Sequence, residues 1–541
     1  MGSKVPRDKD GLNRLFAYVK GDVETLDELN GTVNIEVKDS NHPDIWSVEG
    51  IARSLRGFLG KRQNKPPRVA GVSSLKAIVD KRVRPIRPFI ACAIVKGVRP
   101  SEEALKSWIG LQDKMDQTYG RKRKKASIGL YQADLVESPL KYTVARPSEV
   151  IFVPLGSEEK MTLAQIVEKH PKGLEYGPII SGFKEWPLLV DGEDKILSLP
   201  PVINSNDLGR ITTGTKNILV EVTGTSLETV HNTLKIVVTA LSERGGRIYS
   251  CAETYETGQP RKLVTPDLRP GNAVLSVSYT NRLLGTELAT SQVIRLLERA
   301  GFQASPKGKD VLRVRIPCYR LDIMHQVDLV EDVAIALDLN KVEPQWPRVW
   351  TPGGLAAETE RLDTIAELMV GLGFQELLTY SLTSPDSLEK RMNSPHTRLV
   401  ELKNPKMTTL TALRNWTLPS LMEFLSNNTH VDYPQRVFEV GTCATPEGET
   451  FGRVLNQNKL AAVTVHANAG FTEIRACLDA LLNSIGVDFS IMPQAHPSFL
   501  EGRSGAVMSG EKKIGMIGEL HPETIKAWGL NLPAAAFELE I

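Results

Sequence analysis

Hydrophobic residues recur along this chain with two spacings, and these predict helices and strands in turn. Apolar positions three or four residues apart predict helices after Ser47, Ser101 and Ser226, and each of these serines can cap a first turn. An apolar run from Phe89 and an alternating pattern from Ile218 predict strands. Helices and strands in this order are typical of a mixed α/β domain.

The middle of the chain also predicts helices and a strand. Residues 279–302 contain a helix whose inner face carries Val293 and Leu297. An alternating strand begins at Val311, and a further helix surrounds Val330. A helix–strand–helix unit of this size resembles a winged nucleic-acid-binding module, and it is equally a generic packing unit.

The last part of the chain predicts one more domain. Apolar residues at core spacing predict a helix over 358–372, and strand patterns follow near 374–384, 437–441 and 505–520, the last of them hairpin-like. We expect a sheet with helices packed against one face.

A chain of 541 residues is too long for a single core, so these patterns predict an α+β multidomain fold. Proline-rich breaks at 65–67 and 342–354 help to place the boundaries. The predicted parts are an N-terminal domain of residues 1–64, a mixed α/β domain of residues 65–262, a helix–strand–helix module of residues 265–345 and a last domain of residues 355–541.

The composition, with 41% hydrophobic and 24% charged residues, is that of an ordinary globular protein. The apolar runs are too short to cross a membrane, and the first residues lack the apolar core of a signal peptide, so we expect a cytoplasmic protein without membrane contact. Widely spaced cysteines indicate neither a disulfide framework nor a zinc site and are expected to be buried: Cys92, Cys251, Cys318, Cys443 and Cys477.

Positive charge is concentrated in the N-terminal half. Between Ala52 and Arg99 there are thirteen Lys or Arg residues and a single acidic one, Asp80, and the basic run Arg121–Lys125 follows. This distribution indicates contact with an anion such as nucleic acid. A solvated basic face, or a surface that meets an acidic partner, explains it equally well.

Carboxylates gather around the predicted helix near Val330. Three of them have helical spacing and the fourth precedes the helix: Asp328, Glu331, Asp332 and Asp322. Oxygen ligands of this kind suit Mg²⁺. Acidic residues near a helix N-terminus also stabilise the helix dipole without any metal, so the spacing leaves both interpretations open.

Eight segments, in order along nearly the whole chain, resemble the beta subunit of phenylalanine–tRNA ligase in its archaeal and eukaryotic form. They are NHPDIWSVEGIARSLRGFLG, GRKRKKASIGLYQADL, HPKGLEYG, PLLVDGEDKILSLPPVINS, VEVTGTS, IPCYRLDIMHQVDLVEDVAIA, KNPKMTTLTALRNWTLPSLM and HPSFLEGRSGAV. Each alone is weak, but eight matches in order are highly specific.

The resemblance implies an α₂β₂ ligase that joins phenylalanine to tRNA(Phe) with ATP, whose alpha subunit binds the ATP and phenylalanine and carries the synthetic site. It also implies that the last domain is a class II synthetase core without chemistry. Residues 502–505, GRSG, do not supply the arginine-containing glycine motif that ATP binding needs in that fold. The resemblance assigns Mg²⁺ ligands to Asp322, Asp328, Glu331 and Asp332, near the alpha subunit.

A second function that the resemblance implies is hydrolytic editing of tyrosyl-tRNA(Phe), in a domain of residues 65–262. The matching positions are Leu189, Ser198, Glu221 and Thr223. We expect Glu221 to bind the tyrosyl hydroxyl, Ser198 and Thr223 to be polar lining, and Leu189 to be an apolar wall. Relatives often have Asp in place of Glu221. A positioned water is the expected nucleophile, and the run 121–125 is expected to face tRNA.

Two alternatives differ in class from this interpretation. One is a non-catalytic RNA-binding or scaffold paralogue that kept the fold and lost both sites. The other is a free-standing hydrolase of mischarged tRNA. Co-purification with an alpha subunit separates the ligase subunit from both.

Overall fold

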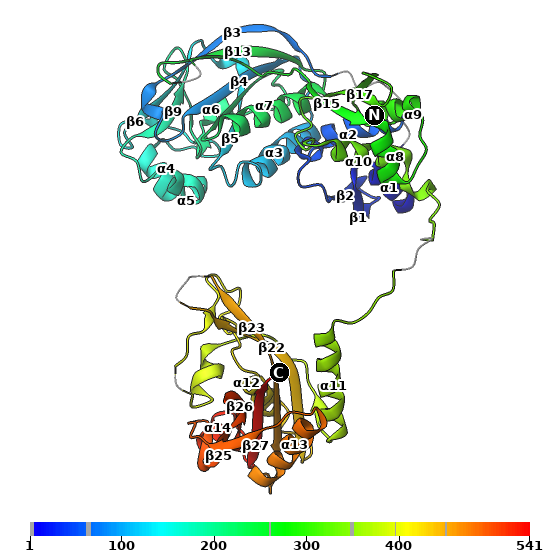
Figure 1. Ribbon diagram of the computed structural model, residues 1–541. Coiled ribbons are helices and arrows are strands. Elements are labelled where there is room, and N and C mark those ends of the chain that lie inside the picture. Colours follow the sequence, from blue (N-terminus) through cyan, green and yellow to red (C-terminus); the bar gives the residue numbers. More distant parts are fainter. Residues whose placement is uncertain (1–4, 61–65, 259–260, 347–350, 395, 449–451) are drawn as a thin grey trace. The chain divides into compact units, whose positions relative to one another are not determined.

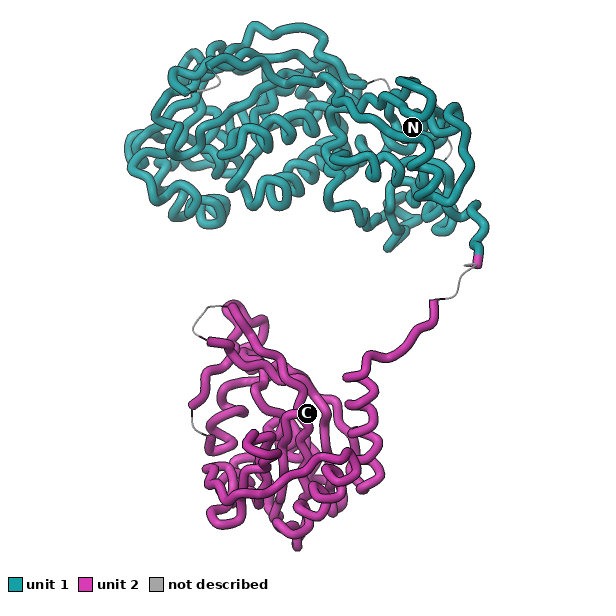
Figure 2. Tube along the Cα trace, in the orientation of Figure 1, with its two compact units in different colours: residues 1–345 teal, residues 346–541 magenta. Residues whose placement is uncertain are grey.

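The computed structural model describes residues 5–60, 66–258, 261–346, 351–394, 396–448 and 452–541. They form two compact units, residues 1–345 and 346–541 (Figure 2). The break between the units falls inside the predicted linker 342–354, whose residues 347–350 lie outside the described residues, as does the predicted boundary at 64 and 65. None of the described helices is long and apolar enough to span a membrane.

A sheet of ten strands is the scaffold of the first unit (Figure 1). The strand order is β11-β10-β9-β6-β3-β13-β4-β12-β5, and β14 pairs with β13. The strands are β3 (Val69–Val79), β4 (Phe89–Lys96), β5 (Ala126–Gln132), β6 (Leu140–Ala145), β9 (Trp186–Val190), β10 (Ile196–Leu199), β11 (Ile203–Asn204), β12 (Asn217–Gly224), β13 (Arg247–Tyr255) and β14 (Lys262–Thr265).

Two long helices cover one face of this sheet (Figure 1). They are α3 (Glu102–Gln117) and α7 (Leu227–Ser242), and they begin after Ser101 and Ser226, as predicted. Each serine accepts a hydrogen bond from the backbone N–H three residues on, which caps the helix. Shorter elements at the edge of the domain are β7 (Ile151–Phe152), β8 (Met161–Thr162), α4 (Leu163–Lys169), α5 (Pro171–Tyr176) and α6 (Asn206–Gly209).

Strand β12 differs from its sequence pattern. Alternation predicted one inner and one outer face, but both faces are buried from Ile218 to Gly224. Val220 and Val222 pack under α3 and α7, whereas Leu219 joins a second core made by the other strands of the sheet. A polar residue on this second face, such as Glu221, is therefore enclosed by protein.

The N-terminal residues form a small layer with its own core. Its elements are α1 (Lys9–Phe16), β1 (Gly21–Asp27), β2 (Thr32–Val37) and α2 (Val48–Phe58). The prediction for α2 is confirmed, since Ser47 accepts a hydrogen bond from Gly50 N at 3.1 Å. The antiparallel hairpin of β1 and β2 was not predicted, because its strands carry few apolar residues.

The rest of the first unit is a three-stranded antiparallel sheet with three helices (Figure 1). Its elements are β15 (Gly271–Ser276), α8 (Val277–Leu284), α9 (Thr290–Arg299), β16 (Gln303–Pro306), β17 (Val311–Ile316) and α10 (Gln326–Leu337). The predicted elements α9, β17 and α10 are confirmed, and β15, β16 and α8 are additional. Val293, Leu297, Leu312 and Val330 meet in one core.

The second unit is built on a seven-stranded sheet of order β18-β22-β23-β27-β26-β25-β24, in which only the pair β18–β22 is parallel. The strands are β18 (Gln375–Glu376), β22 (Gln435–Pro446), β23 (Val454–Val465), β24 (Ser490–Pro493), β25 (Phe499–Ser509), β26 (Lys512–Leu520) and β27 (Ala534–Glu540). The predicted hairpin near 505–520 is confirmed as β25 and β26. The strand predicted near 374–384 is reduced to β18 and the two-residue β19 (Leu382–Thr383), which pairs with β21 (Ala412–Leu413) beside β20 (Val400–Glu401).

Helices cover both faces of this second sheet, so the prediction of one covered face was wrong. On one face lie α11 (Ala357–Gly371) and α13 (Phe471–Ser484), and on the other α12 (Leu418–Asn427) and α14 (Pro522–Ala527). Neighbouring residues of β27, such as Ala536 and Phe537, belong to the two opposite cores. Both faces are apolar, and the sequence pattern of the strands did not reveal the second.

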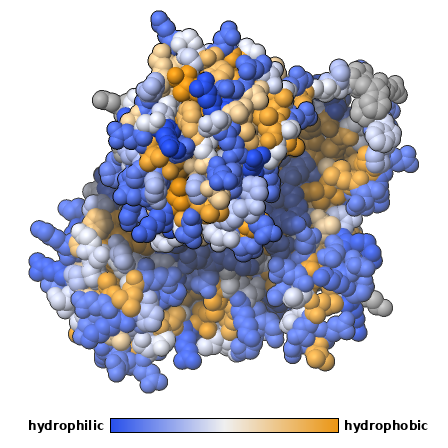
Figure 3. Space-filling model, turned by 90° about the horizontal axis from the view of Figure 1, so that it is seen from below, coloured by the Kyte–Doolittle hydropathy of each residue, from blue (hydrophilic) through white to orange (hydrophobic). Residues whose placement is uncertain are grey.

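The cysteines are mostly in these cores. Cys92, Cys251, Cys318 and Cys443 are buried, as predicted, and Cys477 is half-buried. On the face that Figure 3 shows, groups of hydrophobic residues alternate with hydrophilic ones. This mixed surface agrees with the ordinary composition of the chain.

Candidate functional site

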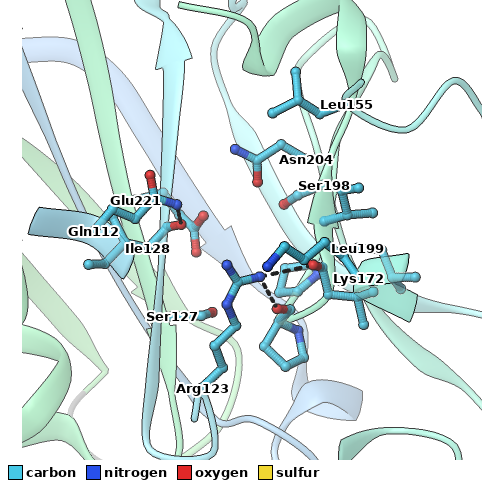
Figure 4. Close-up of a pocket in the computed structure, with 14 residues that line it drawn as sticks. Gln112, Arg123, Ser127, Ile128, Leu155, Lys172, Ser198, Leu199, Asn204 and Glu221 are labelled. Atoms are coloured by element: carbon cyan, nitrogen blue, oxygen red, sulfur yellow. Dashed lines mark hydrogen bonds between the residues drawn. The ribbon is translucent and has the colours of Figure 1, made fainter. Parts of the chain in front are cut away.

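A cavity of about 190 Å³ opens within the ten-stranded sheet of the first unit (Figure 4). In the view, Glu221 and Ser127 lie on one side, and Ser198 and Asn204 on the other. Glu221 comes from β12, Ser127 from β5, Ser198 from β10 and Asn204 from β11. The complete lining is Gln112, Arg123, Ser127, Ile128, Leu155, Lys172, Ser198, Leu199, Pro200, Pro201, Val202, Ile203, Asn204 and Glu221.

Of the four residues predicted to form an editing pocket, Ser198 and Glu221 line this cavity. Leu189 does not, but it is the β9 partner of Ser198 and is fully buried in the core behind it. Thr223 does not line it either. Its hydroxyl is 3.2 Å from that of Ser127, which does. The four residues therefore lie close together in the fold. Ser198 and Glu221 line the cavity, and Leu189 and Thr223 contact residues that line it.

Glu221 is enclosed, with 3% of its surface exposed. Its partner across the β5–β12 pairing is Gly129, where a Cβ would stand 2.4 Å from Glu221 Oε2. Only a glycine leaves room for this carboxyl. Burial raises the pKa of Glu221 to about 7, because the charged form loses its water.

The hydrogen bond from Tyr131 and the charge of Arg87 lower the pKa of Glu221 and so offset part of the effect of burial. Tyr131 Oη lies 3.1 Å from Glu221 Oε2 and 3.3 Å from Asn204 Oδ1. A phenol has one proton, and burial raises the pKa of Tyr131 well above its usual value, so it stays neutral. Tyr131 donates this proton to Glu221 Oε2, and Asn204 Oδ1 is a second acceptor within its reach.

Two polar atoms of cavity residues have neither a hydrogen-bond partner nor an ion-pair partner among the described residues. They are Glu221 Oε1 and Ser198 Oγ, and both are buried. Buried polar atoms without a partner are uncommon and are a cost to folding, which a bound ligand can offset. The two atoms therefore indicate a ligand with a hydroxyl or similar polar group.

Two buried arginines hold the walls of the cavity. Arg87 donates to the hydroxyls of Thr223 and Ser127, at 3.0 Å each, and to the carbonyl of Thr223. Arg123 donates to the carbonyl oxygens of Pro201 and Val202 at 3.1 and 3.0 Å, and so fixes the segment after β10 (Figure 4). The predicted editing pocket did not include Arg87, Gln112, Arg123, Tyr131 or Asn204.

The basic run Arg121–Lys125 is only partly available to an outside partner. Its backbone turns through three residues with positive φ, Arg121 to Arg123. The turn sends Arg123 inward, where its guanidinium pairs with Asp116 at 2.9 Å and lies 4.1 Å from the ring centre of Tyr176. Arg121, Lys122 and Lys124 stay exposed. The prediction that the whole run faces tRNA therefore needs correction at Arg123.

The four carboxylates near α10 are engaged separately. Asp322 and Asp332 both bind the guanidinium of Arg320, each at 2.6 Å, and Glu331 binds Lys20 at 2.6 Å. Asp328 accepts from the backbone N–H groups of Met324 and His325 and caps the helix. No group of three or more potential ligands that could hold a metal ion occurs among the described residues. In this arrangement the donor set does not fit Mg²⁺.

Burial and pairing act against each other at these carboxyls. Burial raises the pKa of Asp332. At Asp322 burial is also the largest single influence. The hydrogen bonds and the positive charge of Arg320 together outweigh it, so the pKa of Asp322 is lowered. The guanidinium occupies the position between the two carboxyls that a cation would need.

Comparison with known proteins gives a consistent family. The chain is 41% identical over 527 residues to a protein of Pyrococcus furiosus named phenylalanine–tRNA ligase beta subunit. The match covers 97% of this chain and 94% of that protein. It is 40% identical over 542 residues to a protein of the same name from Thermococcus kodakarensis, with the same coverage. Family models match at residues 342–541, "Phenylalanyl tRNA synthetase beta chain CLM domain", and 273–338, "tRNA synthetase B5 domain".

A solved structure supports the first unit. It is the N-terminal fragment of the phenylalanyl-tRNA synthetase beta subunit of Pyrococcus horikoshii, 39% identical, with a TM-score of 0.58. The match covers 61% of this chain and 94% of that one. The similarity therefore extends from sequence to fold in the part that carries the cavity.

Proposed function

This chain belongs to the family of phenylalanine–tRNA ligase beta subunits, and we propose that the cavity around Glu221 is where it edits tyrosyl-tRNA(Phe). An aminoacyl-tRNA synthetase that binds phenylalanine in an apolar pocket rejects tyrosine only weakly, since such a pocket discriminates against an added hydroxyl by roughly a hundredfold. A second site that requires the hydroxyl removes the error. The alternatives of a scaffold paralogue and a free-standing hydrolase are not favoured at this level of identity.

The unpartnered Oε1 of Glu221 carries the proposal. Tyr131 donates to Oε2, so Oε1 is free to accept the O–H of a tyrosyl ring. A phenylalanyl ring leaves Oε1 unsatisfied, and a buried acceptor without a partner costs about 1–3 kcal/mol. The same carboxyl thus selects the wrong amino acid for hydrolysis and spares the right one.

Hydrolysis then needs a nucleophile. Among the lining residues no hydroxyl has a histidine or free carboxylate beside it that would make it a base-activated nucleophile. A water molecule is the simpler choice. Its oxygen attacks the ester carbonyl carbon, the bond from that carbon to the ribose oxygen breaks, and the ribose oxygen takes up the proton. Ser198 Oγ, which has no partner, can hold this water.

We propose the rest of the assembly by analogy with the family. The chain pairs with an alpha subunit, in a proposed α₂β₂ heterotetramer in which the alpha subunit binds ATP and phenylalanine and carries the synthetic site. Residues 355–541 act as a non-catalytic class II-like core. The tRNA reaches the cavity near Lys172, and the exposed Arg121, Lys122 and Lys124 contact its phosphates.

Magnesium has a narrower place in this proposal. Asp322, Asp328, Glu331 and Asp332 are bound by Arg320, Lys20 and backbone groups within this chain. They can take up Mg²⁺ only if the alpha subunit draws these partners away. In the isolated chain we expect added Mg²⁺ to leave the unfolding midpoint unchanged.

The test of the editing proposal is Glu221→Ala in the reconstituted ligase. Hydrolysis of tyrosyl-tRNA(Phe) should fall about a hundredfold, because the acceptor for the phenol and the geometry around Tyr131 are both lost. Phenylalanylation should not change. Glu228→Ala, an exposed glutamate at the start of α7, is the matched control and should edit normally. Normal editing by Glu221→Ala would reject the assignment of this cavity.

A further inference from the structure

A second cavity, of about 310 Å³, lies in the second unit on the face of the seven-stranded sheet that also carries α12. Its walls come from β23, β25, β26 and β27, from the segment just before β25, and from the start of α12 with the residues before it. It belongs to a different unit from the editing cavity. Its size is at the lower end of small-molecule sites, which suits a ligand with one ring.

Three aromatic rings form one part of the wall. The ring of His496 meets those of Trp416 and Phe499 edge-on, with centroids 6.0 and 5.8 Å apart. His496 Nδ1 accepts from Ser498 N at 3.2 Å, so the ring proton is on Nε2. Burial lowers the pKa of His496, which keeps this ring neutral. Such a wall favours an aromatic ligand.

Two charged groups in the same lining are not neutralised within the chain. The side chains of Lys513, which is exposed, and Glu540, which is half-buried, have no ion-pair or hydrogen-bond partner in the described part of the molecule. The neighbouring pair is different, since Glu538 accepts from Thr417 N and Leu418 N and also lies 3.4 Å from Lys459. The cavity therefore offers one free cation and one free anion beside an aromatic wall.

A β-bulge brings Lys513 into this position. Along β26, Gly515 pairs with Val507, but Lys513 pairs with the next residue, Met508, so Ile514 is the extra residue. Ile514 packs on the opposite core, and both Lys513 and Gly515 line the cavity. Bulges frequently redirect side chains beside binding sites.

From these observations we propose that this cavity binds a free aromatic amino acid as its zwitterion. The ring lies against Trp416, His496 and Phe499, the carboxylate pairs with Lys513, and the ammonium group pairs with Glu540. A nucleotide fits poorly, because Glu538 and Glu540 would repel its phosphates. This inference is independent of the editing proposal.

The test is calorimetric titration of the full chain alone, without alpha subunit or tRNA. L-phenylalanine should bind with a stoichiometry of one, and L-alanine, which lacks the ring, should give no signal at the same concentration. 3-Phenylpropionate and phenethylamine lack the ammonium and the carboxylate respectively, and each should bind about tenfold more weakly, the loss expected for one charge-assisted contact.

Variants locate the site. Lys513→Gln and Glu540→Gln should each weaken L-phenylalanine binding about tenfold. Lys512→Gln, an exposed neighbour outside the cavity, should have no effect. The inference is overturned if L-phenylalanine does not bind at millimolar concentration, if L-alanine binds equally well, or if Lys513→Gln behaves like Lys512→Gln.

Discussion

The buried position of the Glu221 side chain depends on Gly129, its partner on the neighbouring strand. A Cβ at Gly129 would lie 2.3 Å from Tyr131 Oη and 2.4 Å from Glu221 Oε2. We expect Gly129→Ala to displace both groups and to destabilise the chain by about 1–3 kcal/mol, as overpacking of a filled core does. Urea unfolding and tyrosyl-tRNA hydrolysis, which should fall with it, are the measurements.

Gly110→Ala is the matched control for this change. Gly110 lies within α3, and nothing stands within 4 Å of the Cβ that it would gain. Alanine is a better helix former than glycine by about 1 kcal/mol, so this variant should be slightly stabilised and should edit normally. Equal behaviour of the two variants would show that Gly129 is not required for space.

The buried carboxyl of Glu221 also makes stability depend on pH. Its pKa is raised to about 7 from 4.5, so the folded chain holds a proton that the unfolded chain loses between these values. Stability contributed in this way is present below about pH 4.5 and decreases as the pH rises towards 7. Glu221→Gln, which cannot ionise, should lack this part of the slope.

The measurement is urea unfolding from pH 4.5 to 8 for both proteins. The difference in unfolding free energy should shift by up to about 3 kcal/mol across this range in favour of the glutamine variant at high pH. Glu253 is also buried, and burial raises its pKa to about 8, but it is common to both proteins and cancels in the difference. A constant difference would mean that Glu221 is ionised throughout.

At this scale the sequence identified part of the site. The family resemblance selected Glu221 and Ser198, which line the cavity, and placed Thr223 and Leu189 next to it. It could not select Tyr131 or Arg87, since their roles depend on β5, β12 and the segment before β4 meeting in the fold. Nothing in the pattern of a basic run distinguishes Arg123, which turns inward, from the exposed Lys122 and Lys124.

Among the elements, α10 shows most clearly what spacing can and cannot predict. Its apolar face was predicted, because helical periodicity depends on local sequence. The environment of its carboxylates was not, because Arg320 precedes the helix and Lys20 comes from the N-terminal layer. The second covered face of the sheet in residues 346–541 was missed for a similar reason, since it depends on helices distant in sequence.

Removing the Arg320 side chain, which bonds to two carboxylates, should lower the stability of the chain strongly. Its guanidinium is almost fully buried and bonds to both Asp322 and Asp332. Arg320→Met would leave two buried carboxyls without their partner, and breaking a buried pair in this way costs about 3–5 kcal/mol. Urea unfolding should show this loss. Arg313→Met, at an exposed position of β17, should be close to neutral. Equal stabilities of the two variants would contradict a stabilising role for the pairing of Arg320 with Asp322 and Asp332.

For the whole molecule, the distribution of core residues predicts that the two units fold separately. Every residue of the two cores in the second unit comes from position 365 onward, and the five cores of the first unit end at Leu337. No core cluster of the described residues is shared between the units. The solved fragment from Pyrococcus horikoshii shows that the N-terminal part of a relative can be isolated.

We therefore expect fragments 1–345 and 355–541 each to unfold cooperatively, at the urea midpoints of two transitions in the full chain. Near-ultraviolet circular dichroism, which reports fixed tertiary packing, should be retained by both. All residues that line the proposed editing cavity lie from position 112 to position 221, so the first fragment should also bind tyrosyl-tRNA. A fragment that keeps helical content but loses its near-ultraviolet signal would show that its core needs the other unit.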